Sequence, residues 1–129
     1  MPAFVLLFNI EEKKAAFIRM QLAVMKIRSI AVDPADFDQT IAAILGLEAK
    51  TGKVCEAPFR EEMLLLGNFS RAQLDAFLGS FAKNRVPPVA LKAMLTGTNV
   101  GWTARRLASE LSEEHERILQ MKREKEKSE

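Results

Sequence analysis

Two short apolar runs constrain this chain more than any other feature, because they indicate where a sheet can form. The run at 5–9 reads Val-Leu-Leu-Phe-Asn, and the run at 63–68 reads Met-Leu-Leu-Leu-Gly-Asn. Each lacks polar alternation, ends in a turn-forming Asn and precedes a helical pattern. Such runs are typical of strands that are buried on both faces of a parallel sheet. We therefore expect the two strands to lie side by side at the centre and to run in the same direction.

Periodicity and capping signals predict the other elements. Helices are expected over about 11–25, 34–45 and 70–84, and a last helix begins near Trp102 or Thr103. The apolar stripe of the first helix is expected to consist of Phe17, Met20 and Val24, widened by Ile18, Leu22 and Met25. Ser70 and Gln73 have the spacing of a capping box, which marks the clearest helix start in the chain. Strands over about 27–32 and after Pro87-Pro88 carry polar residues, which is typical of sheet edges.

These elements divide the chain into two similar halves. Residues 3–46 and 62–112 each contain a strand, a helix, a strand and a helix in that order, and a linker over 47–61 joins them. The linker has no clean period and is expected to be exposed and able to move. A charged helical extension follows over 113–129. The pattern predicts one domain over 1–129 with a pseudo-twofold internal repeat.

Right-handed helical crossovers between parallel strands give the strand order 2-1-3-4. The predicted fold is therefore a small α/β protein with a four-stranded, mostly parallel sheet and helices on both faces. An α+β fold with some antiparallel pairing remains the alternative, because the long linker can reverse the direction of the chain.

Composition limits the classes of function. Among 129 residues, 19 are Lys or Arg and 17 are Asp or Glu, which gives a net charge of +2 and argues against a nucleic-acid partner. No apolar stretch approaches the roughly 20 residues of a membrane span, and the N-terminal run is too short for a signal peptide. The single Cys55 excludes an intramolecular disulfide and is typical of a cytoplasmic protein.

The strand order predicts one place for a ligand. Ligands of open α/β sheets bind outside the carboxyl ends of the strands, where the strand order reverses. Here Asn9 and Asn68 would flank that point, between the first and third strands. Either these two side chains hold a polar ligand, or each Asn only satisfies the turn after its strand.

A second candidate is the polar loop over 96–103, between the fourth strand and the last helix. Its Thr, Asn and Gly residues could present hydroxyl and N–H groups to an anion, although the P-loop pattern is absent. Alternatively, they cap the helix, while Lys92 blocks pairing at the sheet edge. The residues predicted as ligand contacts at both places are Asn9, Asn68, Lys92, Thr96, Thr98, Asn99, Trp102 and Thr103.

Residues that could carry catalysis are sparse. His115 is the only histidine and lies in a charged helical stretch, so it makes no ordinary zinc site. Cys55 has no neighbouring His in the sequence to act as its base. The sequence therefore predicts no catalytic residue, no metal and no cofactor, and it favours a protein that is not an enzyme.

One stretch of the chain, between 91 and 111, stands out by its residues: Leu91-Lys92-Ala93, Leu95-Thr96, Thr98-Asn99, Trp102-Thr103, Leu107 and Glu110-Leu111. In these residues the chain resembles an uncharacterised bacterial domain-of-unknown-function family of short proteins. The resemblance covers mainly 60–115, with weaker similarity at 5–9 and 39–47. It implies a small α/β bacterial protein and supplies no activity, ligand or catalytic residue.

Two functional hypotheses follow. The first is a non-enzymatic interaction or regulatory module that binds a protein partner or forms a homo-oligomer. The second is a small-molecule or anion-binding domain that uses the 96–103 loop. Neither hypothesis involves a membrane or a nucleic acid.

Overall fold

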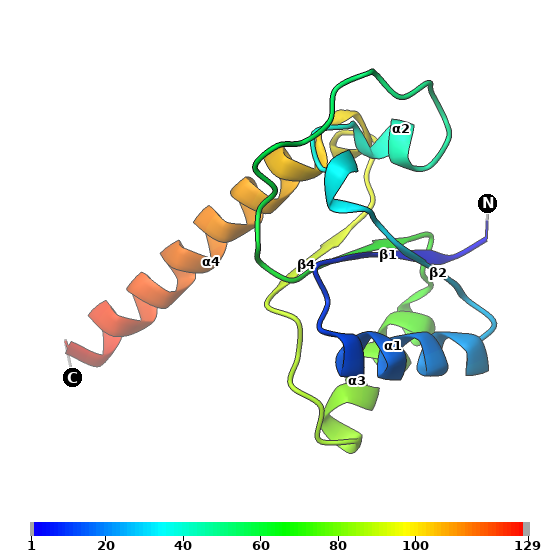
Figure 1. Ribbon diagram of the computed structural model, residues 1–129. Helices are drawn as coiled ribbons and strands as arrows, with labels where there is room; N and C mark the ends of the chain where they lie inside the picture. The colour runs from blue at the N-terminus through cyan, green and yellow to red at the C-terminus, as the bar shows by residue number, and fades with distance from the viewer. Residues whose placement is uncertain (1, 128–129) are drawn as a thin grey trace.

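The computed structural model, which describes residues 2–127, contains one four-stranded sheet with helices on both faces (Figure 1). The strands follow the order β2-β1-β3-β4, as the sequence predicted. They are β1 (Phe4–Phe8), β2 (Arg28–Ala31), β3 (Met63–Gly67) and β4 (Leu91–Met94). The helices are α1 (Glu12–Val24), α2 (Ile41–Ile44), α3 (Arg71–Lys83) and α4 (Ala104–Lys127), with short 3-10 turns η1 (Pro34–Asp36) and η2 (Asn99–Gly101).

The prediction that the two central strands are parallel was wrong. β1 is parallel to β2, and β3 is parallel to β4, but β1 and β3 pair antiparallel, with Phe4 opposite Gly67 and Phe8 opposite Met63. The reason lies in the connection from β2 to β3. Its only α-helix, α2, has four residues, too few to return the chain along the sheet, as a parallel crossover requires. The chain therefore enters β3 at the end where β1 finishes.

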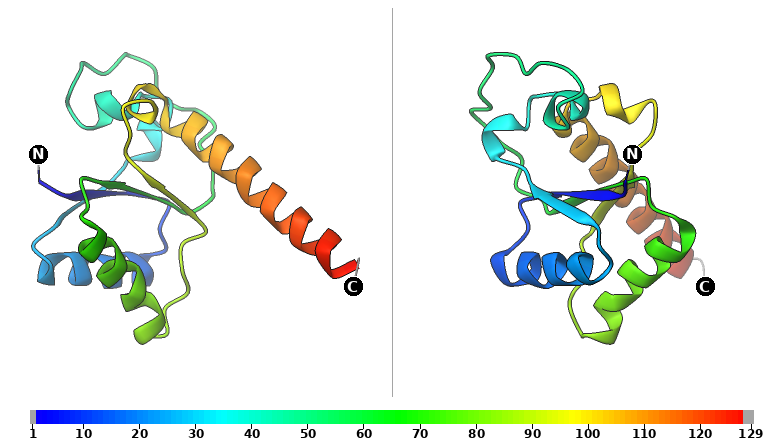
Figure 2. Two further views of the ribbon diagram at one scale, coloured as in Figure 1. Left: turned by 180° about the vertical axis from the view of Figure 1, so that it is seen from behind. Right: turned by 90° about the vertical axis from the view of Figure 1, so that its right-hand side faces the viewer.

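The strands carry two separate apolar layers, because successive side chains point to opposite faces. Phe4, Leu6 and Phe8 belong to the layer that includes residues of α4, whereas Val5 and Leu7 belong to the layer that includes residues of α1 and α3. Figure 2 shows α1 and α3 on one side of the sheet, with α2 and α4 on the other. All residues of β1 and β3 are buried, which confirms that these two strands form the centre.

The buried face of α1 differs from the predicted one. Ala15, Ile18 and Leu22 are buried, whereas Met20 and Val24, expected in the apolar stripe, are 57% and 77% exposed. The face is therefore centred on Ile18 and Leu22, and Met20 and Val24 lie on the solvent side.

The predicted capping box is confirmed, but the helix predicted over 34–45 is wrong. Ser70 and Gln73 form the predicted capping box: the Gln73 N–H lies 3.1 Å from Ser70 Oγ, and the Ser70 N–H lies 2.9 Å from Gln73 Oε1. The helix expected over 34–45 is instead divided into η1 and α2. The division occurs because Thr40 forms an antiparallel bridge with Thr103 and caps α2 through its hydroxyl.

Most of residues 47–61 are exposed, as the sequence predicted, but several contacts join this segment to the body. Gln39, which is 3% exposed, donates from Nε2 to the carbonyls of Thr51 and Lys53 at 2.9 and 3.1 Å. Its Oε1 accepts the Thr51 N–H at 2.9 Å. Further along, the Phe59 ring stacks on Phe37 at a centroid distance of 4.3 Å. The buried amide of Gln39 and the ring of Phe37 are thus two of the groups that contact this segment.

The two halves match in several local details. α1 and α3 have 13 residues each. Each half has one residue with positive φ after its first strand, Asn9 or Asn68, and one just after its first helix, Lys26 or Arg85.

Candidate functional site

The two Asn residues predicted to flank a ligand do not share a cleft. Because β1 and β3 are antiparallel, Asn9 and Asn68 follow the strands at opposite ends of this central pair. Asn9 donates from Nδ2 to the carbonyls of Phe59 and Glu61 at 2.7 and 3.2 Å, so it fastens the chain just before β3. Asn68 is exposed and has φ of 59°. The reversal of strand order therefore creates no site between them.

The 96–103 loop is organised by a reciprocal pair of hydrogen bonds. The Thr96 N–H donates to Asn99 Oδ1 at 2.8 Å, and the Asn99 N–H donates to Thr96 Oγ1 at 3.0 Å. Asn99 is buried, and its Nδ2 donates to the Met94 carbonyl at 2.9 Å. Thr98 is exposed, and its carbonyl accepts the Gly101 N–H at 3.3 Å. The amide of Asn99 is thus engaged within the loop itself.

Trp102 and Thr103 join this loop to α4 and α2. Thr103 Oγ1 accepts the Arg106 N–H at 3.1 Å, in the manner of a helix cap. The Trp102 carbonyl accepts the Ile41 N–H at 2.8 Å. The Trp102 ring packs on the core, and the Arg106 guanidinium lies 4.4 Å from its centroid. These contacts position α4 against the sheet.

Lys92 lies apart from the 96–103 loop, on the edge strand β4. Its Nζ donates to the Val89 carbonyl at 2.7 Å, beside an apolar cavity of about 70 Å³ that Leu78, Phe81 and Pro88 also line. Burial of the ammonium lowers the pKa of Lys92. The cavity is too small for an organic ligand of ordinary size.

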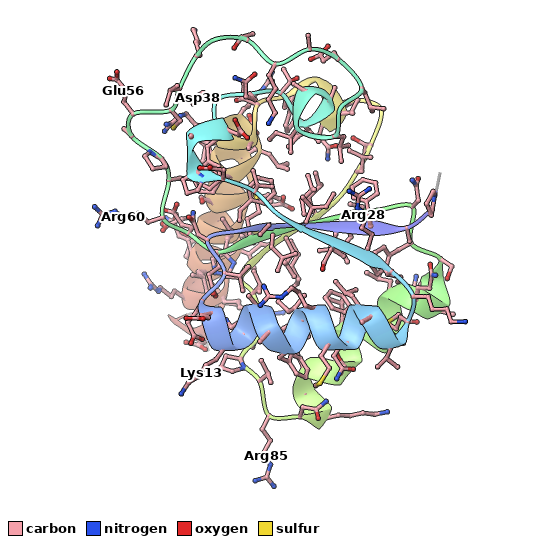
Figure 3. All side chains as sticks on the ribbon, turned by 45° about the vertical axis from the view of Figure 1, so that its right-hand side comes forward. Lys13, Arg28, Asp38, Glu56, Arg60 and Arg85 are labelled. Atoms are coloured by element: carbon pink, nitrogen blue, oxygen red, sulfur yellow. The ribbon has the colours of Figure 1, made fainter. Side chains whose placement is uncertain are left out.

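Sequence reasoning missed a polar cluster around Arg105. Its Nε donates to Asp38 Oδ1 at 2.6 Å, and its Nη2 lies 3.0 Å from Cys55 Sγ and also donates to the Ala57 carbonyl. The hydrogen bond from Arg105 lowers the pKa of Asp38, and Asp38 in turn raises the pKa of Arg105. In Figure 3, Asp38 lies beside the 47–61 segment, from which Glu56 and Arg60 point outward. The cluster ties α4 to that segment.

A groove of about 440 Å³ lies at the carboxyl ends of the parallel strands β1 and β2. Its polar lining is Asn9, Glu12 and Arg19, and its apolar lining is Leu7, Ile10, Ala15, Ala31, Val32 and Pro34. This is the end of a parallel pair at which α/β proteins bind ligands. No sequence signal pointed to Arg19, because it enters the groove only through the packing of α1 on β2.

The N-terminus of α1 beside this groove already holds a carboxylate. Glu62 accepts the Glu11 N–H at 3.0 Å and pairs with Lys14 Nζ at 2.7 Å. Burial by itself would raise the pKa of Glu62, but the Glu11 N–H and the Lys14 ammonium outweigh it and lower the pKa. An anionic ligand would therefore have to use Arg19 rather than the start of the helix.

Three exposed apolar side chains lie on the part of α4 that extends beyond the body. Its first turns bury Ala104, Leu107 and Ala108, but residues 113–126 are exposed throughout. Both figures of the ribbon show this part projecting away from the sheet (Figures 1 and 2). It carries Ile118, Leu119 and Met121, which are 46%, 39% and 67% exposed. Residues 128–129 of the predicted extension lie outside the described residues.

The described part of the chain has neither a metal-binding cluster nor a membrane-spanning helix. Within residues 2–127, His, Cys, Asp and Glu side chains form no group of three that could hold a metal ion. None of the helices in that range combines the length and apolar character needed to cross a membrane.

Comparison with known proteins relates part of the chain to a family of unknown function. Searches of the curated proteins and of the solved structures found no match. Residues 62–118 match a family model described as Domain of unknown function (DUF3783). The match includes the 91–111 pattern, so the resemblance to an uncharacterised family is confirmed for this segment. The part of the chain from β3 into α4 is thus similar to a domain whose function is unknown.

Proposed function

We propose that this protein is a non-enzymatic interaction module whose contact surface is the exposed half of α4, residues 113–126. The observation that supports this proposal is the length of the helix beyond its packed turns. α4 has 24 residues, which corresponds to about 36 Å, yet its last buried residue is Ala108 and its last half-buried apolar residue is Leu111. An isolated helical segment of this length is marginal in water, and a protein partner would stabilise it.

The side chains on the exposed half suit a protein partner. Single apolar residues on a surface are ordinary, but Ile118, Leu119 and Met121 fall within one helical turn. An amphipathic helix that presents an apolar strip between charged residues is a recurring mode of protein recognition.

Site-specific photo-cross-linking in growing cells tests this function. A benzoylphenylalanine at Met121 is expected to give discrete cross-linked products, because its side chain would lie within the contact. The matched control is the same residue at Lys13, whose side chain points into solvent from α1 (Figure 3). The proposal fails if Met121 gives no discrete product, or if both positions give the same set.

We also infer that the two halves are copies of one unit with the order strand, helix, strand, helix. The equal lengths of α1 and α3 and the matching positive-φ residues support this inference. The halves diverge at their last helix, which has four residues in α2 and 24 in α4. On this view the proposed contact surface was added to only one of the copies.

A second candidate function is the binding of a small molecule or an anion. The 96–103 loop supports it less than expected, because Asn99 bonds within the loop, whereas the groove beside Arg19 supports it more. In a thermal-shift screen with phosphate, nucleotides and amino acids, stabilisation that Arg19→Ala abolishes would support the groove. Stabilisation that only Asn99→Ala abolishes would support the loop. If no compound stabilises the protein, this candidate function is ruled out.

We further propose that the protein works in a bacterial cytoplasm without a cofactor. The lone Cys55 and the bacterial family that the sequence resembles support this setting. The net charge of +2 argues against nucleic acid as a partner.

A further inference from the structure

We propose that the exposed half of α4 binds the same helix of a second copy of this chain, in antiparallel orientation. This proposal rests on the proposed function, and it names the partner. It is argued from the distribution of charge along the helix, the spacing of its apolar residues and a groove beside it.

Charge is divided along α4 in a way that suits an antiparallel pair. Residues 110–116 contain four Glu and no Lys or Arg, whereas residues 117–127 contain five Lys or Arg and two Glu. Two parallel copies would place acidic residues opposite acidic residues, which is unfavourable. An antiparallel pair places the acidic part of each helix opposite the basic part of the other.

The spacing of side chains fixes the register. Leu111, Glu114, Ile118, Met121 and Lys125 follow one another in steps of three and four, which is the spacing of a coiled-coil seam. Three of these residues are apolar, and the proposed register sets the charged Glu114 opposite Lys125 of the second copy. A twofold axis between Leu119 and Gln120 sets Ile118 opposite Met121 of the second copy. Arg117 lies just before Ile118, and Glu124 lies three positions after Met121, so both flank the seam on the same side. Across this axis they come together as flanking positions, and each of these contacts occurs twice because the pairing is symmetric.

A groove lies where the second helix would continue. It has a volume of about 170 Å³ and runs between α4 and the start of β4, lined by Ala90, Leu91, Lys92, Leu111, Glu114, His115 and Ile118. In the proposed register, the C-terminal turns of the second copy pass Glu114 and reach this groove. The contact would therefore extend from the free helix onto the body.

The size of this contact sets the expected affinity. Two helical segments of about four turns each bury less than the roughly 800 Å² per partner of a standard interface. We therefore expect a reversible dimer that forms at micromolar concentrations and weakens as salt is raised, because the flanking charges are exposed.

Sedimentation equilibrium of the full chain over about 1–500 µM tests the pairing through a charge exchange. Arg117→Glu and Glu124→Arg each replace both attractive contacts of the dimer with repulsive ones, and each is expected to weaken association by about tenfold or more. An equal mixture of the two variants restores opposite charges at both contacts and should associate like the wild type. Lys13→Glu, a charge change on α1, should leave association unchanged.

The outcomes separate this proposal from the proposed function. A chain that stays monomeric at all concentrations in low salt overturns self-pairing, as does a dimer that neither α4 variant weakens. If such a monomer still cross-links through Met121 to a different protein in cells, the interaction function stands and only the partner is wrong. If the chain stays monomeric and Met121 also gives no cross-linked product, both proposals are wrong.

Discussion

Replacement of Phe37 by Ala is expected to lower the free energy of unfolding by about 3–5 kcal/mol. Phe37 is fully buried between the sheet and the 47–61 segment. Its ring centroid lies 5.7 Å from that of Phe8 and 4.3 Å from that of Phe59. The truncation removes both ring contacts and leaves a cavity that the surrounding residues fill only in part. Urea denaturation followed by circular dichroism measures the loss.

The control for this change is Met20→Ala on the exposed face of α1. Met20 is 57% exposed, so its truncation is expected to change stability by no more than about 0.5 kcal/mol. If Phe37→Ala cost as little as Met20→Ala, Phe37 could not occupy the packed position between Phe8 and Phe59.

Replacement of Gln39 by Leu is expected to cost about 2 kcal/mol and to loosen one segment selectively. The Leu side chain has a similar size but leaves the Thr51 N–H and the carbonyls of Thr51 and Lys53 without their buried partner. These groups would regain hydrogen bonds by turning toward water. Hydrogen exchange measured by mass spectrometry should therefore accelerate in peptides from 47–57, ahead of the rest of the protein.

Gln73→Leu is the matched control, since it removes a side-chain amide of the same size from the capping box of α3. It should cost about 1 kcal/mol or less and leave exchange in 47–57 unchanged. Equal exchange in that segment for wild type and Gln39→Leu would show that Gln39 does not hold it.

The parts of the fold that depend on neighbours along the chain could be predicted from the sequence. The apolar runs at β1 and β3, the capping box at Ser70 and the edge character of β2 all reflect interactions within a few residues. The strand order also followed, because two fully apolar strands are stable only at the centre of a covered sheet. The apolar stripe of α1 was placed less well, since neighbouring apolar positions compete for the same face.

The candidate sites depended more on contacts between distant segments. Arg105, Asp38 and Cys55 meet from three separate parts of the chain, and no spacing in the sequence joins them. The groove beside Arg19 exists only because α1 packs across β1 and β2. By contrast, the exposed half of α4 could be predicted from the sequence. Its residues are mostly charged, so this half has too few apolar side chains to pack against the body.

The sequence by itself determined where the strands and the helices α1, α3 and α4 lie and which two strands are central, because burial and capping act through local patterns. Only the tertiary structure decided the direction of β3, which is antiparallel to β1. That direction depends on how the 47–61 segment is held by Gln39, Asn9 and Phe59. Such contacts between distant residues form only in the complete fold, so the pattern of neighbouring residues in the sequence does not predict them.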